Sequence, residues 1–163
     1  MPRTLTAGLP IDQASKVAIL IHGRGANASG ILALKDHLNL DGFALLAPEA
    51  EGNSWYPYSF MAPDSSNEPA YSRAIGQIDG LVQDLYSKGF QSEQIYFIGF
   101  SQGACLSLEF PARFAKKYGG IIAFTGGLIG EELNHEKICG IILFHAGIYW
   151  KQQAGFSCSF RKN

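Results

Sequence analysis

Residues 95–110, "IYFIGFSQGACLSLEF", place a single turn between two different structural elements. The apolar run 95–99 predicts a buried strand, and residues 102–117 predict a helix. Ser101 lies on the turn between them, flanked by Gly99 and Gly103. Gly-x-Ser-x-Gly between a strand and a helix is the nucleophile-elbow pattern. Both flanking residues must be small, because larger side chains there would collide with the neighbouring helix and strand. The same turn could also have a purely structural role.

Further strands and helices alternate on both sides of this turn. Short apolar runs at 17–21, 43–47 and 120–127 predict strands, whereas apolar residues at helical spacing predict helices over 27–38 and 69–88. Strands alternating with helices indicate an α/β protein whose mostly parallel sheet is covered on both faces. Right-handed crossovers then produce a three-layer αβα sandwich. Residues 48–69 are too long for a plain connection and are interpreted as a lid or pocket wall.

The composition is that of an ordinary soluble protein. At 163 residues the chain is expected to form a single domain, and its net charge of −1 gives no basic surface for nucleic acid. No apolar run is long enough to span a membrane, and the first residues lack the pattern of a signal peptide. Three widely spaced cysteines suit a reducing compartment, so we expect a cytoplasmic protein. Cys105 is interpreted as a small core residue.

A second glycine-rich segment, "HGRGA", follows the strand 17–21. The carboxyl ends of parallel strands meet at one edge of a sheet, so this loop is expected beside Ser101. The backbone N–H groups of Arg24 and Gln102 are candidates for an oxyanion hole, which stabilises developing negative charge. An ordinary strand-to-helix turn is the alternative for this segment. His22 belongs to the same loop and is expected to be structural, because the base of such a fold follows the serine in the chain.

Four stretches together resemble the phospholipase/carboxylesterase family of the α/β-hydrolases, whose relatives include the acyl-protein thioesterases. They are "VAILIHGRGA", "LLAP", "IYFIGFSQGACLSLEF" and "GIIAFTGGLIG", and the resemblance covers residues 15 to about 140. It implies a serine hydrolase of carboxylic esters or thioesters, with an ester or lipid-like substrate and with neither a metal nor an organic cofactor. By position, Ser101 matches the nucleophile, and Arg24 and Gln102 match the oxyanion-hole residues.

The resemblance also places an acyl pocket near three further residues. Trp55 and Tyr56 fall in the loop expected to wall this pocket, and His22 is included as a pocket candidate. Surface aromatic packing is the alternative for Trp55 and Tyr56. The loop contains Trp55, Tyr56, Tyr58 and Phe60, and these suggest an apolar acyl or aromatic group in the substrate.

The family's acid and histidine have no counterpart in their expected context. No aspartate follows Asp84, and the only histidines after Ser101 are His135 and His145. His135 belongs to a charged segment that is interpreted as solvated surface. We therefore expect the chain to lack the base, the acid, the last strand and the last helices of the family fold.

Residues 145–163 fit no expected element and are interpreted as a non-native tail. Reading the codons from the second base of the His145 codon gives, with permitted codon choices, "TPVFIGSSRPDFHVP", which resembles the family's acid-bearing segment. The hypothesis is a one-base insertion between about Gly140 and Phe144, followed by a premature stop. Sequencing the gene downstream of the Cys139 codon decides it.

Two consequences and two alternatives follow from the missing groups. Catalysis is expected to be very slow, and an exposed sheet edge is expected to favour aggregation or a homodimer. The first alternative is a non-catalytic binding module built on the same fold. The second is a partner subunit that supplies the base in trans.

Overall fold

The computed structural model describes residues 3–131, and these form one five-stranded sheet in the order β1-β3-β2-β4-β5. Strand β1 runs antiparallel to β3, and the other neighbours are parallel. The strands are β1 (Thr4–Gly8), β2 (Lys16–Ile21), β3 (Phe43–Pro48), β4 (Ile95–Phe100) and β5 (Gly120–Phe124). The α-helices are α1 (Ala28–Leu32), α2 (Asp64–Asn67), α3 (Ala70–Ser87) and α4 (Gln102–Arg113), and the 3-10 helices are η1 (Ala33–Asp36), η2 (Glu51–Asn53) and η3 (Ser92–Gln94).

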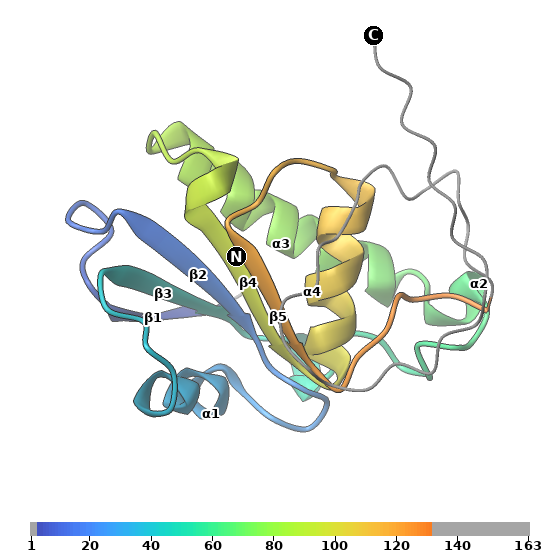
Figure 1. Ribbon diagram of the computed structural model, residues 1–163. Helices are drawn as coiled ribbons and strands as arrows, with labels where there is room; N and C mark the ends of the chain where they lie inside the picture. The colour runs from blue at the N-terminus through green and yellow to red at the C-terminus, as the bar shows by residue number, and fades with distance from the viewer. Residues whose placement is uncertain (1–2, 132–163) are drawn as a thin grey trace, which may run out of the picture.

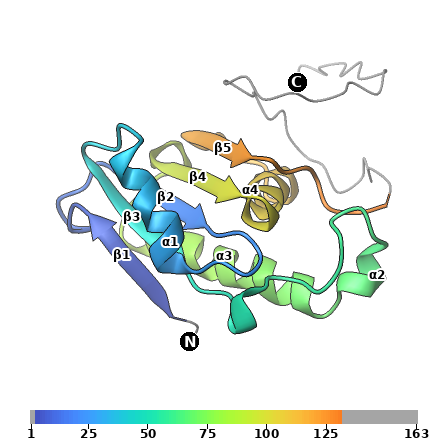
Figure 2. The same ribbon diagram turned by 90° about the horizontal axis from the view of Figure 1, so that it is seen from below.

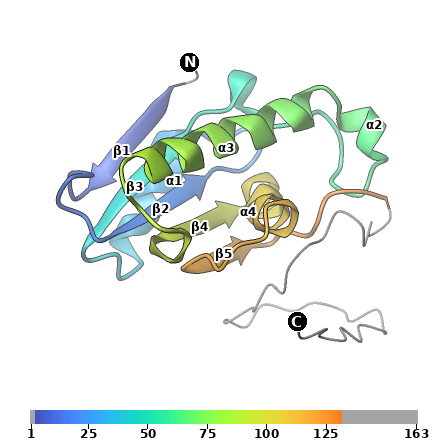
Figure 3. The same ribbon diagram turned by 90° about the horizontal axis from the view of Figure 1, so that it is seen from above.

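Helices cover both faces of this sheet, which confirms the three-layer αβα architecture. Helix α1 lies on one face, and α3 and α4 lie on the other (Figure 1; Figure 2). The alternation of side chains along β2 explains why both faces are closed: Val17, Ile19 and Ile21 join the core beneath α3 and α4, whereas Ala18 and Leu20 join the core beneath α1. Seen from above, α3 runs lengthwise over the strands toward α2, with α4 on the same face (Figure 3).

Most expected elements are present, with shifts at their ends. The helix expected over 27–38 consists of α1 followed by the 3-10 turn η1, and the helix expected over 102–117 ends at Arg113. The strand expected over 120–127 ends at Phe124. Strand β1 was not predicted, because "TLTAG" has no buried residue and carries no strong apolar pattern. The segment becomes a strand because it pairs with β3 along its whole length.

The long segment between β3 and α3 folds back onto the protein. It contains η2 and α2, and its Trp55 and Tyr56 side chains are buried in the core beneath α3 and α4. The alternative of surface aromatic packing is therefore wrong for these two residues, because almost no surface of either is exposed. Cys105 belongs to the same core, as expected.

Candidate active site

Ser101 occupies the sharp turn that its sequence predicts. Its backbone has φ 51° and ψ −114°, a left-handed conformation that residues other than glycine rarely adopt. The residue is exposed and directly precedes α4. Its backbone N–H donates to the Phe124 carbonyl at 2.8 Å, and its own carbonyl accepts from the Cys105 N–H at 3.1 Å. These bonds hold the strained turn between β5 and the first turn of α4.

The two glycines around Ser101 allow the close packing of this turn. A Cβ atom on Gly99 would lie 2.2 Å from the Gly103 carbonyl oxygen. A Cβ atom on Gly103 would lie 2.0 Å from the Ile21 carbonyl oxygen, at the end of β2. Both separations are shorter than atoms tolerate, so larger residues at either position would force the backbone apart. The Gly-x-Ser-x-Gly pattern thus has a steric cause in this structure.

The loop after β2 lies beside Ser101. A Cβ atom on Gly23 would lie 3.4 Å from Ser101 Cβ and 3.2 Å from the Phe100 ring. Within residues 3–131, no hydrogen bond uses the backbone N–H of Arg24. Gln102 is the first residue of α4, where an amide has no acceptor inside the helix. The two glycine-rich segments are therefore brought together, as the sheet topology predicts.

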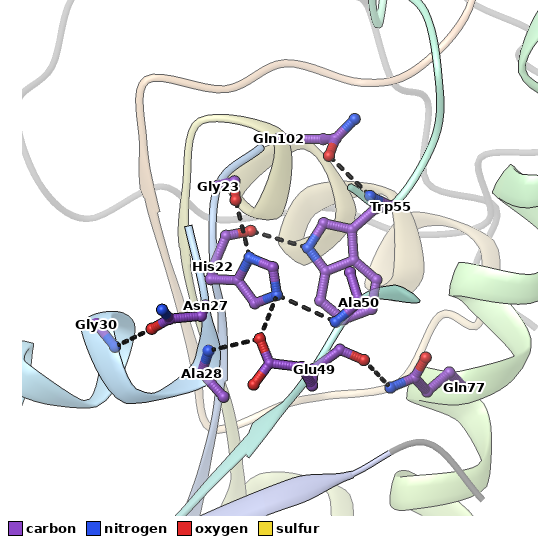
Figure 4. A network of polar contacts seen from close by, with 10 residues as sticks. All are labelled: His22, Gly23, Asn27, Ala28, Gly30, Glu49, Ala50, Trp55, Gln77 and Gln102. Carbon is purple, nitrogen blue, oxygen red and sulfur yellow. Dashed lines mark hydrogen bonds and ion pairs between the residues drawn. The ribbon is translucent and has the colours of Figure 1, made fainter. Parts of the chain in front are cut away.

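The His22 side chain is completely buried and both of its ring nitrogens have neighbours (Figure 4). Nε2 accepts from the Ala50 backbone N–H at 3.1 Å, so Nδ1 carries the proton and donates to the Gly23 carbonyl at 2.8 Å. The Glu49 carboxylate lies 3.7 Å from Nε2 and accepts from the Ala28 N–H at 3.2 Å. A side chain without exposed surface cannot line an open pocket. The expected pocket role of His22 is therefore replaced by a structural one.

Trp55 and Tyr56 connect the loop after β3 to the turn at Ser101. The indole Nε1 donates to the His22 carbonyl at 2.8 Å, and the Trp55 backbone N–H donates to Gln102 Oε1 at 2.9 Å. Gln102 Nε2 in turn donates to the Tyr56 carbonyl at 2.7 Å. The Arg24 guanidinium donates to the same carbonyl at 3.0 Å. These five residues thus form one network of hydrogen bonds around the two candidate amides.

Three titratable groups in the core beneath Ser101, namely Tyr56, Tyr71 and Cys105, are held in their neutral forms. Burial, followed by the neighbouring Cys105, raises the pKa of Tyr56 far above its ordinary value. Burial, followed by the hydrogen bond to Glu109, does the same to the pKa of Tyr71. Burial also raises the pKa of the Cys105 thiol. None of these three groups is therefore suited to remove a proton from Ser101 at neutral pH.

No candidate base for Ser101 is found among residues 3–131. His22 is buried and fully bonded, and His37 lies at the end of η1, which covers the opposite face from α4. Glu109, on α4, is buried, and its carboxylate accepts from the Tyr71 hydroxyl at 2.6 Å, from Arg113 Nε at 2.8 Å and from the Ile129 N–H at 3.0 Å. His135, His145 and residues 145–163, on which the missing-partner and frameshift hypotheses depend, lie outside the described residues.

A hollow of about 600 Å³ lies between η2 and the start of α3. It is lined by Ala50, Glu51, Ser54, Trp55, Ala70, Arg73, Ala74 and Gln77. Trp55 is the one candidate pocket residue on its wall, and neither the Ser101 turn nor the loop after β2 contributes to it. The hollow is therefore separate from the candidate active site. The acyl-pocket roles of Trp55 and Tyr56 stay predictions.

Residues 3–131 contain neither a candidate metal site nor a candidate membrane span. No group of three or more His, Cys, Asp or Glu side chains in residues 3–131 is placed to hold a metal ion. Among the same residues, no helix combines the length and the apolar character needed to cross a membrane.

The sheet order, the serine turn and the adjacent loop define an α/β-hydrolase fold. The family model described as phospholipase/carboxylesterase matches residues 8–147, and the chain belongs to this family. A phospholipase/carboxylesterase from Dyadobacter fermentans DSM 18053 is 50% identical in sequence, with a TM-score of 0.84. This likeness covers 86% of the chain and 67% of the Dyadobacter protein.

The curated relatives are more distant and longer. Acyl-protein thioesterase 1 of Saccharomyces cerevisiae is 29% identical over 145 residues, which cover 75% of this chain and 62% of the yeast protein. A probable carboxylesterase of Oryza sativa subsp. japonica is 28% identical over 131 residues, which cover 66% of this chain and 49% of the rice protein. The chain thus spans about half to three-fifths of the length of these relatives.

The sequence did not reveal how the site is supported. The serine turn and the loop "HGRGA" have recognisable patterns, but the Tyr56 carbonyl is a backbone group and leaves no signal in the sequence. The hydrogen-bonded network of Glu109, Tyr71 and Arg113 also has no local motif, since Tyr71 is 38 positions from Glu109. The helical spacing of Glu109 and Arg113 is the one feature that could have pointed to it.

Proposed function

We propose that this chain carries the nucleophile and oxyanion hole of a serine esterase. Ser101 Oγ attacks the carbonyl carbon of a carboxylic ester, and the backbone N–H groups of Arg24 and Gln102 stabilise the negative charge on the carbonyl oxygen. The alcohol leaves, an acyl group remains on Ser101, and water then releases the acid. The observation that carries this proposal is the exposed, strained Ser101 turn beside the Gly23 loop and the first amide of α4.

The side chains near Ser101 support an apolar group in the substrate. The Phe100 ring is 49% exposed and lies near Gly23, and the Tyr58 side chain is 60% exposed. The Tyr58 carbonyl accepts a hydrogen bond from the Arg24 guanidinium, so Tyr58 belongs to the segment that contacts the proposed oxyanion loop. Exposed apolar surface beside the nucleophile suits an acyl chain or an aromatic group. A thioester is the alternative substrate, supported by the similarity to acyl-protein thioesterase 1.

The rate of the reaction depends on a base that residues 3–131 do not contain. Removing the histidine of a serine–histidine–acid triad lowers turnover on the order of a million-fold. We therefore propose that the 163-residue chain turns over esters very slowly, with a remaining contribution from the oxyanion hole. A chain that acts only as a binding module, or one that receives its base in trans from a partner subunit, would lack the same group.

Labelling with a fluorophosphonate tests the nucleophile and the missing base together. Mass spectrometry of the 163-residue chain is expected to locate the label on Ser101, with a rate many orders of magnitude below that of a complete triad. Ser101→Ala should abolish the label. Rapid labelling of Ser101 would contradict the missing base, and labelling of another residue would contradict the nucleophile. A labelling rate per molecule that rises with protein concentration would favour a base in trans.

A further inference from the structure

The carbonyl oxygen of Tyr56 accepts three hydrogen bonds from different parts of the chain. The donors are Gln102 Nε2 at 2.7 Å, Arg24 Nη2 at 3.0 Å and Ser54 Oγ at 3.0 Å. Two of these donors are the side chains of the residues whose backbone N–H groups form the proposed oxyanion hole. A single carbonyl therefore connects the loop after β2 with the first residue of α4.

The side chain of Gln102 is buried and hydrogen-bonded at both of its polar atoms. It is 5% exposed, its Oε1 accepts from the Trp55 backbone N–H, and its Nε2 donates to the Tyr56 carbonyl. Figure 4 shows the Gln102 amide directed toward the Trp55 backbone. Because Gln102 is the first residue of α4, fixing its side chain also restrains its backbone N–H. These two bonds therefore restrain the position of this amide next to Ser101.

The Arg24 side chain restrains the other amide in the same way. The two terminal nitrogens of its planar guanidinium fork donate to three consecutive carbonyls, those of Tyr56, Pro57 and Tyr58. The neighbouring Gly25 N–H donates to the Asn53 carbonyl at 2.7 Å. The loop after β2 is therefore held to the segment 53–58 through both its backbone and its side chain.

We propose that the Tyr56 carbonyl is a common anchor that sets the spacing of the two oxyanion amides, with Gln102 and Arg24 as positioning residues through their side chains. This proposal rests on the proposed function. Both amides must lie about 3 Å from one oxygen atom, and they come from loops that follow different strands. A misplacement of about 1 Å at such a site can lower the rate by a factor of about 100.

The experiment uses a nucleophile that needs no base. The parent variant combines Ser101→Cys with Cys139→Ser and Cys158→Ser, which leaves Cys105, a buried thiol, as the other cysteine. With p-nitrophenyl acetate, the introduced thiolate at position 101 forms a bond to the carbonyl carbon, and the bond to p-nitrophenolate breaks. With iodoacetamide, the same thiolate displaces iodide from a saturated carbon, so no oxyanion forms. The ratio of the two rates reports the oxyanion hole independently of the ionised fraction of the thiol.

The Gln102→Glu variant removes the donor to Tyr56 while keeping the size of the side chain and an acceptor for Trp55. We expect it to lower the ratio of acylation to alkylation roughly 10- to 100-fold. Gln77→Glu is the matched control, because Gln77 Nε2 also donates to a loop carbonyl, that of Glu49, at 3.1 Å. This control should leave the ratio unchanged. An unchanged ratio in Gln102→Glu would overturn the proposal.

Acid should restore the ratio in the Gln102→Glu variant. Burial beside a carbonyl raises the pKa of the introduced carboxyl group. Below that pKa the neutral group can again donate to the Tyr56 carbonyl, so the ratio should rise toward the parent value. A general structural defect would not be reversed in this way. If the ratio stays low on acidification, the hydrogen bond to Tyr56 is not the cause and the proposal fails.

Two further measurements separate the possible failures. If the parent ratio equals that of glutathione, the oxyanion hole is absent and the proposed function fails together with this proposal. If the parent ratio is high and Gln102→Glu leaves it high, only the positioning role fails. Should Gln102→Glu not fold, as judged by circular dichroism, Arg24→Lys provides the same test. Lysine keeps the positive charge but lacks the planar guanidinium fork, so this variant is expected to lower the ratio of acylation to alkylation about tenfold.

Discussion

Ser101 adopts a backbone conformation that costs about 1–3 kcal/mol for a residue with a side chain. The neighbouring structure maintains it through the Phe124 carbonyl, which accepts from the Ser101 N–H, and through the two flanking glycines. At the scale of single residues, the sequence identified this position because the pattern of small residues around it reflects a steric requirement. It could not reveal the partners of Gln102 and Arg24, since those are backbone N–H and carbonyl groups of a distant loop.

His22 is predicted to stabilise the fold without acting as a base. In His22→Ala, the buried Ala50 N–H loses its acceptor and a cavity forms, so the free energy of unfolding should fall by about 2–4 kcal/mol. His37→Ala, at an exposed position, should change it by less than about 0.5 kcal/mol. Urea unfolding measures the free energy of unfolding of both variants. Equal stabilities of the two variants would contradict the buried role of His22.

Cys105 is predicted to be unreactive in the folded protein. Burial raises the pKa of its thiol, so at pH 8 less thiolate is present than for a free cysteine, and the buried sulfur is also hard to reach. Iodoacetamide should therefore modify Cys105 at least about 100-fold more slowly in buffer than in urea. Peptide mass mapping separates Cys105 from Cys139 and Cys158. Similar rates in both solutions would show that the core around α4 is open.

Strand β2 and helix α4 pack closer together than a side chain at position 103 would permit. Gly103, in the first turn of α4, faces the carbonyl at the end of β2, which brings the proposed oxyanion loop to Ser101. The alternation of strands and helices, read from apolar patterns, predicted these elements and their order. The ends of the predicted elements were less accurate, because the helix expected over 27–38 continues as the 3-10 helix η1. Strand β1 was missed because it depends on its pairing with β3.

Substitution of Gly103 by alanine is predicted to be strongly destabilising. The added Cβ would lie 2.0 Å from the Ile21 carbonyl oxygen, and the required backbone shift should cost about 3 kcal/mol or more. Gly80→Ala, within α3, is the control: nothing lies within 4 Å of its added Cβ, and alanine favours the helix by about 0.5–1 kcal/mol. The free energy of unfolding, measured in urea, should thus fall for Gly103→Ala and rise for Gly80→Ala. A cost below about 1 kcal/mol for Gly103→Ala would contradict the close contact.

At the scale of the whole molecule, the parallel sheet brings two distant loops to one edge. Strands β2 and β4 are neighbours in the sheet, so the loop after β2 and the turn after β4 lie side by side. Sequence alone predicted this meeting because adjacent parallel strands end at the same edge. The expected cytoplasmic location and homodimer stay predictions, as does the frameshift, which concerns residues outside the described range.

The most direct measurement of the central claim is a crystal structure of the 163-residue chain after prolonged reaction with a small fluorophosphonate. We predict phosphorus bonded to Ser101 Oγ, with the phosphoryl oxygen about 2.7–3.1 Å from the backbone nitrogens of both Arg24 and Gln102. A phosphoryl oxygen directed away from these two nitrogens, or phosphorus bonded to another residue, would contradict this claim.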